Sequence, residues 1–544
     1  MSHHHTFDHD AIIVGAGFSG IYMLHKLRNE LGLDAVSFEK MSGVGGTWQW
    51  NRYPGALSDT LSYLYCYSFD DELLRDFRFE NRYVTQPEAL KYLEHVVDRY
   101  DLQRSIQLNT TVRGAHFDEE QNVWTVDLGD GITQTCRFFV NAVGVVSEPI
   151  IPQFPGQDSF QGITCHTSTW PSNLDPTGKR VAVIGSGSSG AQLIPALART
   201  AEQVTAFIRR PQYIVPIGNR PLNESEHAML DSDHRGIWDK QLATSTAFGI
   251  EEEPSQSALE VSDEEREAAY EHAWNFGGPF HFYVGTYNDL ITNRESNKTA
   301  AEFIQRKIRE IVRDPEKARK LTPTDPWARR PVADSGFYEA FNRDNVDIVS
   351  LKETPIEEIA PKGIRTADGV EHEFDVIVYA TGFDGFTGPY RQMNIVGLEG
   401  VTLAEQWRDG GSSYFGVAVS NFPNMFTVYG PYGPFSNNPP LIESEVEFIT
   451  KVIGHAVHTN AERVSVDAAA EERYVADCEA LARQTMLYDV DSWINGGNIP
   501  GKPQQLPFNL IGLGAFREAL DEEHAQGFPG FAFEAKATMP AYTS

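Results

Sequence analysis

Two glycine-rich turns carry the first chemistry that can be recognised in this sequence. One spans residues 15–20 (GAGFSG) and the other spans residues 185–190 (GSGSSG). Glycines at the first, third and sixth positions allow a tight turn whose backbone N–H groups can approach a pyrophosphate at the positive end of a following helix. One such turn is weak evidence, but two predict two nucleotide sites. The glycines are Gly15, Gly17, Gly20, Gly185, Gly187 and Gly190.

Each turn stands between a short apolar run and a helical pattern. Residues 11–14 and 180–184 are expected to be buried strands, and residues 21–28 continue the first turn as a helix. This order is the outline of a βαβ nucleotide-binding unit. Two further apolar runs, 140–144 and 376–382, end in glycine and are expected to complete the two units. The sequence therefore predicts an α/β protein with two Rossmann-like dinucleotide-binding domains.

The residue that ends the next strand distinguishes the two sites, because it faces the adenosine ribose. Glu39 lies 19 residues after Gly20, and a carboxylate at this place accepts hydrogen bonds from ribose hydroxyls, which suits FAD or NAD. Arg209 lies 19 residues after Gly190 and is followed by Arg210. Guanidinium groups suit the 2′-phosphate of NADP, although exposed arginines could also simply be solvated. We expect a strong preference for NADPH over NADH.

The chain divides into three units on this pattern. Residues 1–147 and 383–544 are expected to form the FAD-binding domain, and residues 148–220 and 329–382 the NADP-binding domain. Residues 221–328 carry charged helical patterns, among them the capping-box sequence at 262–265, and are expected to form an inserted helical lobe.

The composition limits the classes of partner. The chain has 544 residues, of which 76 are Asp or Glu and 45 are Lys or Arg, giving a formal net charge of −31. This charge would repel phosphate backbones and anionic membranes, so we expect no nucleic-acid and no membrane partner. An acidic surface fits ordinary solvation or a salt-rich habitat, and it indicates no function by itself. We expect a monomer or a weak oligomer.

The cysteines and the N-terminus bear on the compartment. Cys66, Cys136, Cys165 and Cys478 lack the spacing of a metal site or a redox disulfide, which predicts a reducing cytoplasm and no metal. The first ten residues lack the apolar core of a signal peptide, and no stretch approaches the ~18 apolar residues of a membrane span. We assign no role to the tract His3-His4-His5.

Two longer patterns resemble one enzyme family. The segment FQGITCHTSTWP at 160–171 matches the FxGxxxHxxxW[PD] signature of type I Baeyer–Villiger monooxygenases, through Phe160, Gly162, His166, Trp170 and Pro171. A second family pattern is filled between residues 45 and 59, through Gly46, Thr47, Trp48, Tyr53, Pro54, Gly55 and Asp59. The sequence at 433–435 (GPF) resembles the cyclohexanone monooxygenase branch.

The resemblance implies FAD, NADPH and O2 as reactants. NADPH would reduce FAD, the reduced flavin would take up oxygen, and the resulting flavin peroxide would convert a ketone to an ester or lactone, with sulfides as further substrates. A permanent cation beside the flavin is then required for the developing oxyanion. Arg330 aligns with the family's catalytic arginine and Asp59 with its partner. Arg329 replaces a family lysine that helps to hold the NADP phosphate.

Other roles also follow only from the resemblance. Trp48, Tyr53 and Tyr65 would line the flavin, and Ser188 belongs to the second nucleotide turn. Trp493 and Lys502 lie on a C-terminal loop that closes over NADP in the family. His166 is linked to hinge motion, and we prefer that role to a general base. The predicted pocket for cyclic or medium-sized aliphatic ketones consists of Val143, Val145, Val146, Phe248, Phe280, Phe435 and Phe508, where the three valines depart from the leucines usual in the branch.

Three alternatives stay open at this point. An N-hydroxylating or flavin-containing monooxygenase would act on amines or sulfides with the same cofactors. A disulfide reductase would need a second cysteine close to Cys66, and the sequence offers none nearby. A non-catalytic nucleotide-sensing protein would keep both turns but would not need Arg330.

Overall fold

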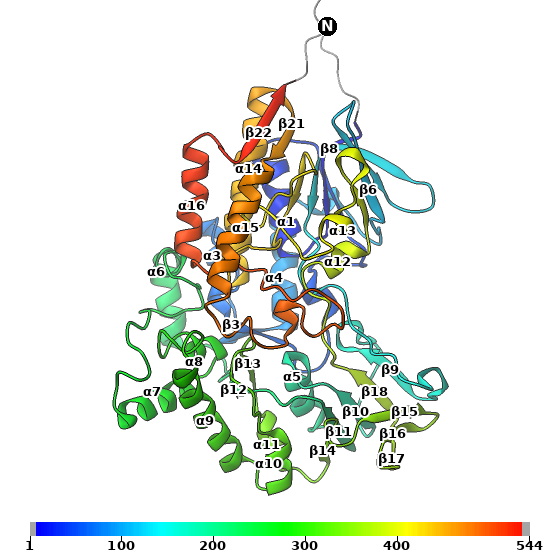
Figure 1. Cartoon of the computed structure of the whole chain (residues 1–544), viewed down its shortest axis with the longest axis vertical. Helices are drawn as coiled ribbons and strands as arrows, with labels where there is room; N and C mark the ends of the chain where they lie inside the picture. Colours follow the sequence, from blue (N-terminus) through cyan, green and yellow to red (C-terminus); the bar gives the residue numbers. More distant parts are fainter. Residues whose placement is uncertain (1–6, 536–544) are drawn as a thin grey trace, which may run out of the picture.

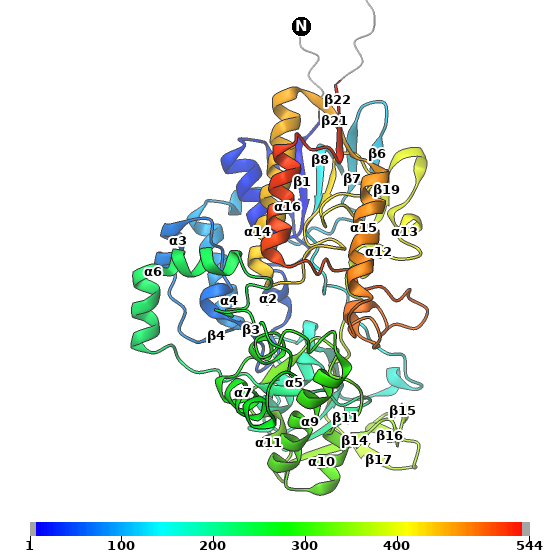
Figure 2. The same ribbon diagram turned by 60° about the vertical axis from the view of Figure 1, so that its left-hand side comes forward.

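The computed structural model describes residues 7–535, so the histidine tract at positions 3–5 lies outside the described residues. Figure 1 shows an upper lobe that contains β8, beside which Figure 2 labels β1, and a lower lobe built around β10 and β18. Helices α7–α10 lie beside the lower sheet in both Figure 1 and Figure 2, whereas α6 lies beside α3 (Asp71–Asp76). The predicted α/β class, with two Rossmann-like sheets and a helical insertion, is confirmed.

The upper sheet has eight strands in the order β19-β6-β7-β8-β1-β2-β5, with β20 also paired to β8. Its centre is parallel, because β1 pairs with β2 on one side and β8 on the other. All of β2 and the last four residues of β1 and of β8 are buried, which explains why these stretches read as continuous apolar runs in the sequence. The strands are β1 (His9–Val14), β2 (Ala35–Phe38), β5 (Ile106–Gln107), β6 (Gly114–Asp118), β7 (Val123–Asp127), β8 (Thr133–Asn141), β19 (Asn394–Val396) and β20 (Met425–Thr427).

The lower sheet is entirely parallel, with the order β14-β11-β10-β18-β9. A small antiparallel sheet, β15-β16-β17, is inserted between β14 and β18. The lower strands are β9 (Ile163–His166), β10 (Arg180–Ile184), β11 (Gln203–Ile208), β14 (Val346–Ser350) and β18 (Val376–Tyr379). The inserted strands are β15 (Ile356–Ala360), β16 (Gly363–Thr366) and β17 (Glu371–Glu373).

The predicted strands at 140–144 and 376–382 each end three residues early, at Asn141 in β8 and at Tyr379 in β18. The cause is the same in both lobes. The carbonyl groups of Ala142 and Ala380 lie against the first glycine of the neighbouring turn, so the chain leaves the sheet there.

Helices cover both sheets. In the upper lobe, α1 (Phe18–Leu24) continues as a π-helical turn (His25–Glu30), so the predicted helix at 21–28 is present. The C-terminal helices α14 (Asn438–Thr459), α15 (Ala468–Ala482) and α16 (Leu513–Ala525) stand beside this sheet, and α14 packs on α1 (Figures 1 and 2). In the lower lobe, α5 (Ser188–Leu197) follows the second glycine turn.

The inserted helices fall within residues 221–328. Ser262 and Glu265 form the predicted capping box at the start of α7, in which each side chain accepts a hydrogen bond from the other residue's backbone N–H. The boundaries drawn from the sequence for the three units stay a prediction. The inserted helices are α6 (Glu224–Leu242), α7 (Asp263–Phe276), α8 (Pro279–Tyr283), α9 (Arg294–Ile311) and α10 (Pro315–Leu321).

All four cysteines are buried and unpaired. Burial raises the pKa of the Cys165 and Cys478 thiols to about 12, and it raises the pKa of Cys66 and Cys136 as well. Among residues 7–535 there is no group of three or more His, Cys, Asp or Glu side chains placed to hold a metal ion. No helix in the same range is long and apolar enough to cross a membrane.

The closeness of helix α5 to its turn gives a test of stability. A Cβ atom on Gly190 would lie 2.4 Å from the carbonyl oxygen of Gly185, whereas one on Gly454, inside α14, would meet only a Leu31 methyl at 3.6 Å. We expect Gly190→Ala to lower the free energy of unfolding by about 3 kcal/mol. Gly454→Ala should raise it by up to about 1 kcal/mol, because alanine is the better helix former. Urea unfolding of both variants measures this, and equal effects would contradict it.

Candidate functional site

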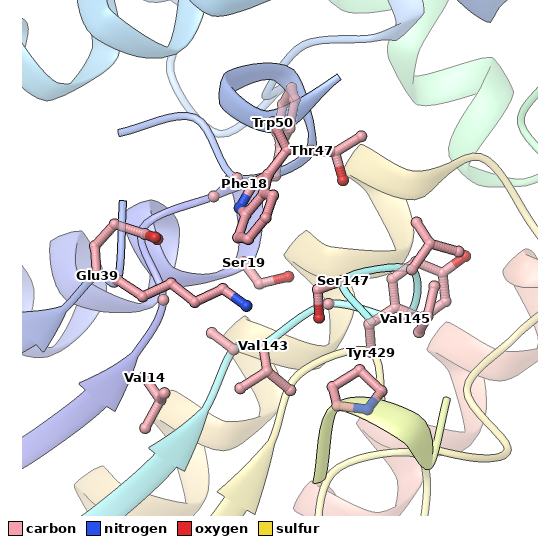
Figure 3. A pocket seen from close by; sticks show the side chains of 18 of the residues that line it. Val14, Phe18, Ser19, Glu39, Thr47, Trp50, Val143, Val145, Ser147 and Tyr429 are labelled. Carbon is pink, nitrogen blue, oxygen red and sulfur yellow. The ribbon is translucent and has the colours of Figure 1, made fainter. Parts of the chain in front are cut away.

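A cavity of about 390 Å³ opens at the carboxyl ends of β1, β2 and β8 in the upper lobe. Figure 3 shows side chains from several elements around it, among them Phe18, Glu39, Thr47, Val143 and Tyr429. The cavity therefore lies at the edge of the sheet where α/β proteins bind ligands.

The first glycine turn forms one wall of this cavity. Gly15 has a φ of +104°, and a Cβ atom there would lie 2.6 Å from the carbonyl oxygen of Ala142. A Cβ atom on Gly17 would lie 3.3 Å from the Cα atom of Gly46. Only glycines leave this space, so two stretches of backbone can approach a ligand together.

Glu39 is fixed at the end of β2. Its Oε2 accepts a hydrogen bond from the backbone N–H of Ala16 at 2.8 Å, and its Oε1 accepts one from that of Met41 at 2.8 Å. The side chain is buried yet lines the cavity, so further lone pairs face the ligand space. A glycine cradle with a fixed carboxylate fits the diphosphate and ribose of FAD.

The other residues predicted for this site separate into two groups. Gly46, Thr47, Trp48 and Tyr65 line the cavity. Gly20 lies in α1, where a Cβ atom would collide with the Gly15 carbonyl at 1.8 Å. Sequence reasoning missed several lining residues, and of these only Ser19, inside the first glycine turn, and Lys40, directly after Glu39, had a positional signal. The missed residues include Ser19, Lys40, Trp50, Thr111, Ser147 and Tyr429.

The second glycine turn repeats the geometry of the first. Gly185 has a φ of +114°, and a Cβ atom there would lie 2.3 Å from the carbonyl oxygen of Ala380. A Cβ atom on Gly187 would meet nothing within 4 Å, so this side of the turn is open. The arrangement fits a second dinucleotide.

The arginines predicted to hold a 2′-phosphate lie around this turn. Arg209 is exposed and forms no ion pair among the described residues. Arg210 pairs with the carboxylate of Asp491 at 2.6 Å. Arg329 pairs with Asp325 at 2.8 Å, and its Nε donates to the backbone carbonyl of Asp491 at 3.0 Å. Asp491, which precedes the predicted NADP-binding loop residue Trp493 by two positions, thus contacts two of the three cations.

Arg330 joins the two lobes. Its Nη2 donates to the carboxylate of Asp59, at the middle of β3 (Leu57–Leu61) in the upper lobe. Its Nη1 donates to the hydroxyl of Ser188, the first residue of α5, at 3.3 Å. The side chains of Arg330 and Asp59 are 26% and 17% exposed, so the guanidinium group is held in a half-buried place. The sequence predicted this pair.

Gln192 also links the two lobes, and it was not predicted from the sequence. Its Oε1 accepts a hydrogen bond from the Tyr53 hydroxyl at 2.7 Å, and its Nε2 donates to the Leu57 carbonyl at 3.1 Å. A Cβ atom on Gly55, whose φ is +87°, would lie 2.6 Å from the Gln192 carbonyl oxygen. Because Ser188 and Gln192 are four residues apart on α5, one helix face holds both Arg330 and the segment that leads to Asp59.

His166 is a structural residue in this geometry. Its Nδ1 accepts a hydrogen bond from the Ser168 backbone N–H at 3.1 Å, so Nε2 carries the proton and donates to the Gly382 carbonyl at 3.1 Å. Burial lowers the pKa of His166 to about 4. The ring is therefore neutral near pH 7 and ties the signature segment to the end of β18.

The rest of the signature packs around this bond. Phe160 packs on the core of the lower lobe and Trp170 on the core shared by both lobes. A Cβ atom on Gly162 would lie 2.5 Å from the Asp375 carbonyl, and the Pro171 carbonyl accepts from Leu174 at 3.0 Å.

The phenylalanines of the predicted substrate pocket form a continuous aromatic cluster beside Arg330. The rings of Phe248 and Phe280 stack at 3.5 Å, Phe280 lies 6.4 Å from Phe435, and Phe435 lies edge-on to Phe508 at 5.3 Å. The guanidinium carbon of Arg330 is 5.6 Å from the Phe280 ring centre. An apolar molecule with a carbonyl group would thus meet a cation next to aromatic walls.

The predicted valines connect this cluster with the upper cavity. Val145 and Val146 pack in one apolar cluster with Phe435 and Phe508, and all three predicted valines line the cavity. Phe386 also belongs to the cluster, edge-on to Phe508 at 5.0 Å, and no sequence motif pointed to it.

The predicted NADP-binding loop residues lie farther along the same wall. Trp493 stacks on Phe386 with 6.3 Å between ring centres. Lys502 donates to Asp384 Oδ1 at 2.5 Å and to the Gly385 carbonyl at 2.8 Å. Its ammonium group is therefore held by residues that follow β18, and its predicted contact with NADP stays a prediction.

Comparison with known proteins finds relatives that are all described as monooxygenases. The family described as flavin-binding monooxygenase-like matches residues 9–220. A phenazine N-monooxygenase of Lysobacter antibioticus is 48% identical, with 96% of each chain covered, and a cyclohexanone 1,2-monooxygenase of an Acinetobacter species is 44% identical, again with 96% of each covered. A Baeyer–Villiger monooxygenase of Pseudooceanicola batsensis is 44% identical, over 96% of this chain and 95% of that one. The solved cyclohexanone monooxygenase from Rhodococcus sp. Phi1 bound to NADP+ superposes with a TM-score of 0.96 at 47% identity, covering 97% of this chain and 99% of that one.

The neutral state of His166 predicts a pH effect on stability. The unfolded histidine has a pKa near 6.5, so between pH 6.5 and 4 the unfolded chain binds a proton that the folded protein does not. Stability is thus lost as the pH falls through this window. From pH 7 to pH 5, His166→Gln should lose about 2 kcal/mol less free energy of unfolding than the parent.

Urea titrations at the two pH values measure this difference. Parallel losses in both proteins would contradict the neutral assignment. Since His166 moves no proton in the reaction under this assignment, the acid limb of the pH–rate profile should be the same in the variant.

Proposed function

This chain belongs to the Baeyer–Villiger monooxygenases, and we propose that it uses FAD, NADPH and O2 to convert an apolar ketone to a lactone or ester. The reaction balances as ketone, NADPH, H⁺ and O2 giving the lactone or ester, NADP⁺ and water. The observation that carries the proposal is the guanidinium group of Arg330, held between Asp59 and Ser188 beside an aromatic cluster.

The residues present fit both cofactors. The cradle of Gly15, Gly17 and Gly46, with Glu39 at the ribose position, would hold FAD, and the turn at 185–190 would hold NADPH. When bound, FAD supplies the path by which electrons from NADPH activate oxygen. The protein's own contribution is position, charge and the exclusion of water.

Arg330 provides a positive charge beside the aromatic cluster. A guanidinium group cannot give up its proton near neutral pH, so it stabilises negative charge that develops on the carbonyl oxygen without acting as an acid. Asp59 and Ser188 fix its orientation from two sides. Asp59 therefore acts through Arg330 and also limits how much positive charge the substrate experiences.

The aromatic cluster indicates the substrate class. Phe248, Phe280, Phe435 and Phe508 offer burial to an apolar molecule and no charged partner besides Arg330. Cyclic and medium-sized aliphatic ketones fit this environment, and sulfides are a further class. The unpaired cysteines support a cytoplasmic location, and we propose a monomeric or weakly associated protein.

One comparison favours a second candidate function. The relative from Lysobacter antibioticus is named a phenazine N-monooxygenase and is 48% identical to this chain. Oxygenation of an aromatic nitrogen needs the same cofactors and a flat apolar site, and the stacked phenylalanines would suit a planar ring.

Product analysis with isotopic oxygen tests the function. FAD-loaded protein is incubated with NADPH, ¹⁸O2 and separate panels of ketones, sulfides, amines and aromatic nitrogen heterocycles. We expect a lactone or ester that carries one heavy oxygen atom. N-oxide or hydroxylated amine products alone would favour the second candidate, and unchanged NADPH in the presence of bound flavin would support the nucleotide-sensing alternative.

Arg330 should be required for product formation. We expect Arg330→Ala to reduce the rate of lactone formation by about a hundredfold or more, the scale of one lost oxyanion donor. The matched control is Arg104→Ala, which removes an arginine that is 68% exposed and paired only with a surface aspartate. Wild-type ester formation by Arg330→Ala, measured by gas chromatography, would refute the assignment.

We expect the contacts of Gln192 between the two lobes to affect how much product forms for each NADPH consumed. Gln192→Leu keeps the side-chain volume but removes the hydrogen bonds to Tyr53 and Leu57. We expect the amount of product per NADPH consumed to fall about threefold or more, because the two lost hydrogen bonds contribute about 0.5–1.5 kcal/mol each. Gln203→Leu, at the exposed start of β11, is the control. An unchanged amount of product per NADPH in Gln192→Leu would show that the contact between the two lobes does not depend on this side chain.

A further inference from the structure

Asp491 contacts two of the arginines that are expected near the 2′-phosphate of NADPH. Its Oδ2 accepts a hydrogen bond from Nη2 of Arg210 at 2.6 Å, and its backbone carbonyl accepts one from Nε of Arg329 at 3.0 Å. The side chains of Asp491 and Arg210 are 49% and 41% exposed, so an anion from solvent can reach this pair. The second glycine turn holds Arg210 in place, because the Ser186 hydroxyl donates to the Arg210 carbonyl at 3.2 Å.

Asp491 belongs to a compact turn that also carries Trp493, and we call residues 487–497 the Trp493 turn. The buried side chain of Asn495 bonds to backbone groups along this turn. Its partners are the carbonyls of Leu487 and Val490 and the N–H groups of Ser492 and Gly497. Because of these bonds, Asp491 and Trp493 are expected to move together. The Trp493 ring stacks on Phe386, so the position of the turn affects the aromatic cluster.

A phosphate group and the Asp491 carboxylate compete for Arg210. Both are anions, and a guanidinium group binds both through the same kind of charge-assisted hydrogen bond. A phosphate carries more negative charge than a carboxylate, and the two repel each other at short distance. An exposed ion pair stabilises the folded chain only weakly, so a phosphate can replace the carboxylate at Arg210. A nucleotide without a 2′-phosphate brings no such competitor.

We propose that Asp491 is a displaceable counter-ion of the second nucleotide site: a 2′-phosphate replaces it at Arg210 and thereby frees the Trp493 turn. This rests on the proposed function, because it supposes that NADPH binds at the turn of residues 185–190. Release of the Trp493 turn is then specific for NADPH, since NADH carries a hydroxyl group in place of the 2′-phosphate. Asp491 acts through Arg210 and the turn, so it is a positioning residue.

Binding of 2′,5′-ADP to the FAD-loaded protein tests this competition without turnover. Asp491→Asn keeps the shape of the side chain and removes its charge. We expect this variant to bind 2′,5′-ADP about threefold more tightly than the parent in isothermal titration calorimetry, the scale of one exposed ion pair. The affinity for 5′-ADP, which lacks the 2′-phosphate, should be the same in both proteins. The gain should shrink at high salt, because salt screens exposed charges.

Asp489→Asn is the matched control for this measurement. Asp489 lies in the same turn, is 50% exposed and pairs with Arg294 of α9. Its loss weakens another attachment of the turn but frees no arginine at the nucleotide site, so the affinity for 2′,5′-ADP should not change. In an Arg210→Gln background, Asp491→Asn should have no effect either. Equal gains in the two aspartate variants, or a gain that persists without Arg210, would overturn the proposal.

Hydrogen–deuterium exchange of residues 487–497 measures the release of the Trp493 turn. In the FAD-loaded parent, saturating 2′,5′-ADP should raise the amide exchange of this turn, and saturating 5′-ADP should not. In Asp491→Asn the exchange should already be higher without nucleotide, and 2′,5′-ADP should change it little. Exchange in the parent that stays the same at saturating 2′,5′-ADP would contradict the release.

The outcomes separate this inference from the proposed function. Equal affinities of the parent and Asp491→Asn for 2′,5′-ADP would overturn the counter-ion role alone and leave the assignment of NADPH in place. A parent protein that does not bind 2′,5′-ADP would overturn both. Failure of the isotopic-oxygen experiment together with the expected gain in affinity would overturn the proposed function and leave a 2′-phosphate site with Asp491 as its counter-ion.

Discussion

The ion pair between Arg330 and Asp59 is the constraint on which the rest of the site depends. The two residues come from different lobes and stand half-buried, where an ion pair gains little net stability after desolvation. The ion pair instead positions Arg330, because the guanidinium group must lie between a nucleotide turn and an aromatic cluster. The same requirement explains three other residues, each of which brings α5 closer to the segment that ends at Asp59. They are Ser188, Gln192 and Gly55.

The two nucleotide turns have the same backbone arrangement, although we expect them to bind different ligands. In both lobes a glycine with positive φ lies against the carbonyl of the alanine that directly follows the neighbouring parallel strand, Ala142 in one and Ala380 in the other. The shape is therefore nearly the same, and the difference lies in charge. A fixed carboxylate, Glu39, stands at one turn, whereas arginines stand near the other. Arg210 forms an ion pair with Asp491.

Much of this could be predicted from the sequence, because local backbone requirements leave local signs. The glycine spacing, Glu39 at the end of β2 and the apolar strands are all set within about 30 residues. Arg330 and Asp59 could be paired only through the family resemblance, since they are 271 positions apart. Gln192 and Phe386 left no sign in the sequence, because their significance arises from contacts between distant segments.

The burial of the four cysteines has a consequence for the lifetime of the enzyme. When an oxygenase consumes NADPH and O2 without a substrate, the balanced product is hydrogen peroxide, which attacks thiolates far faster than thiols. Cys66, Cys136, Cys165 and Cys478 are all shielded from solvent, and burial raises the pKa of each. Hydrogen peroxide formed at the protein therefore meets almost no thiolate. The burial of the four cysteine side chains protects them from oxidation.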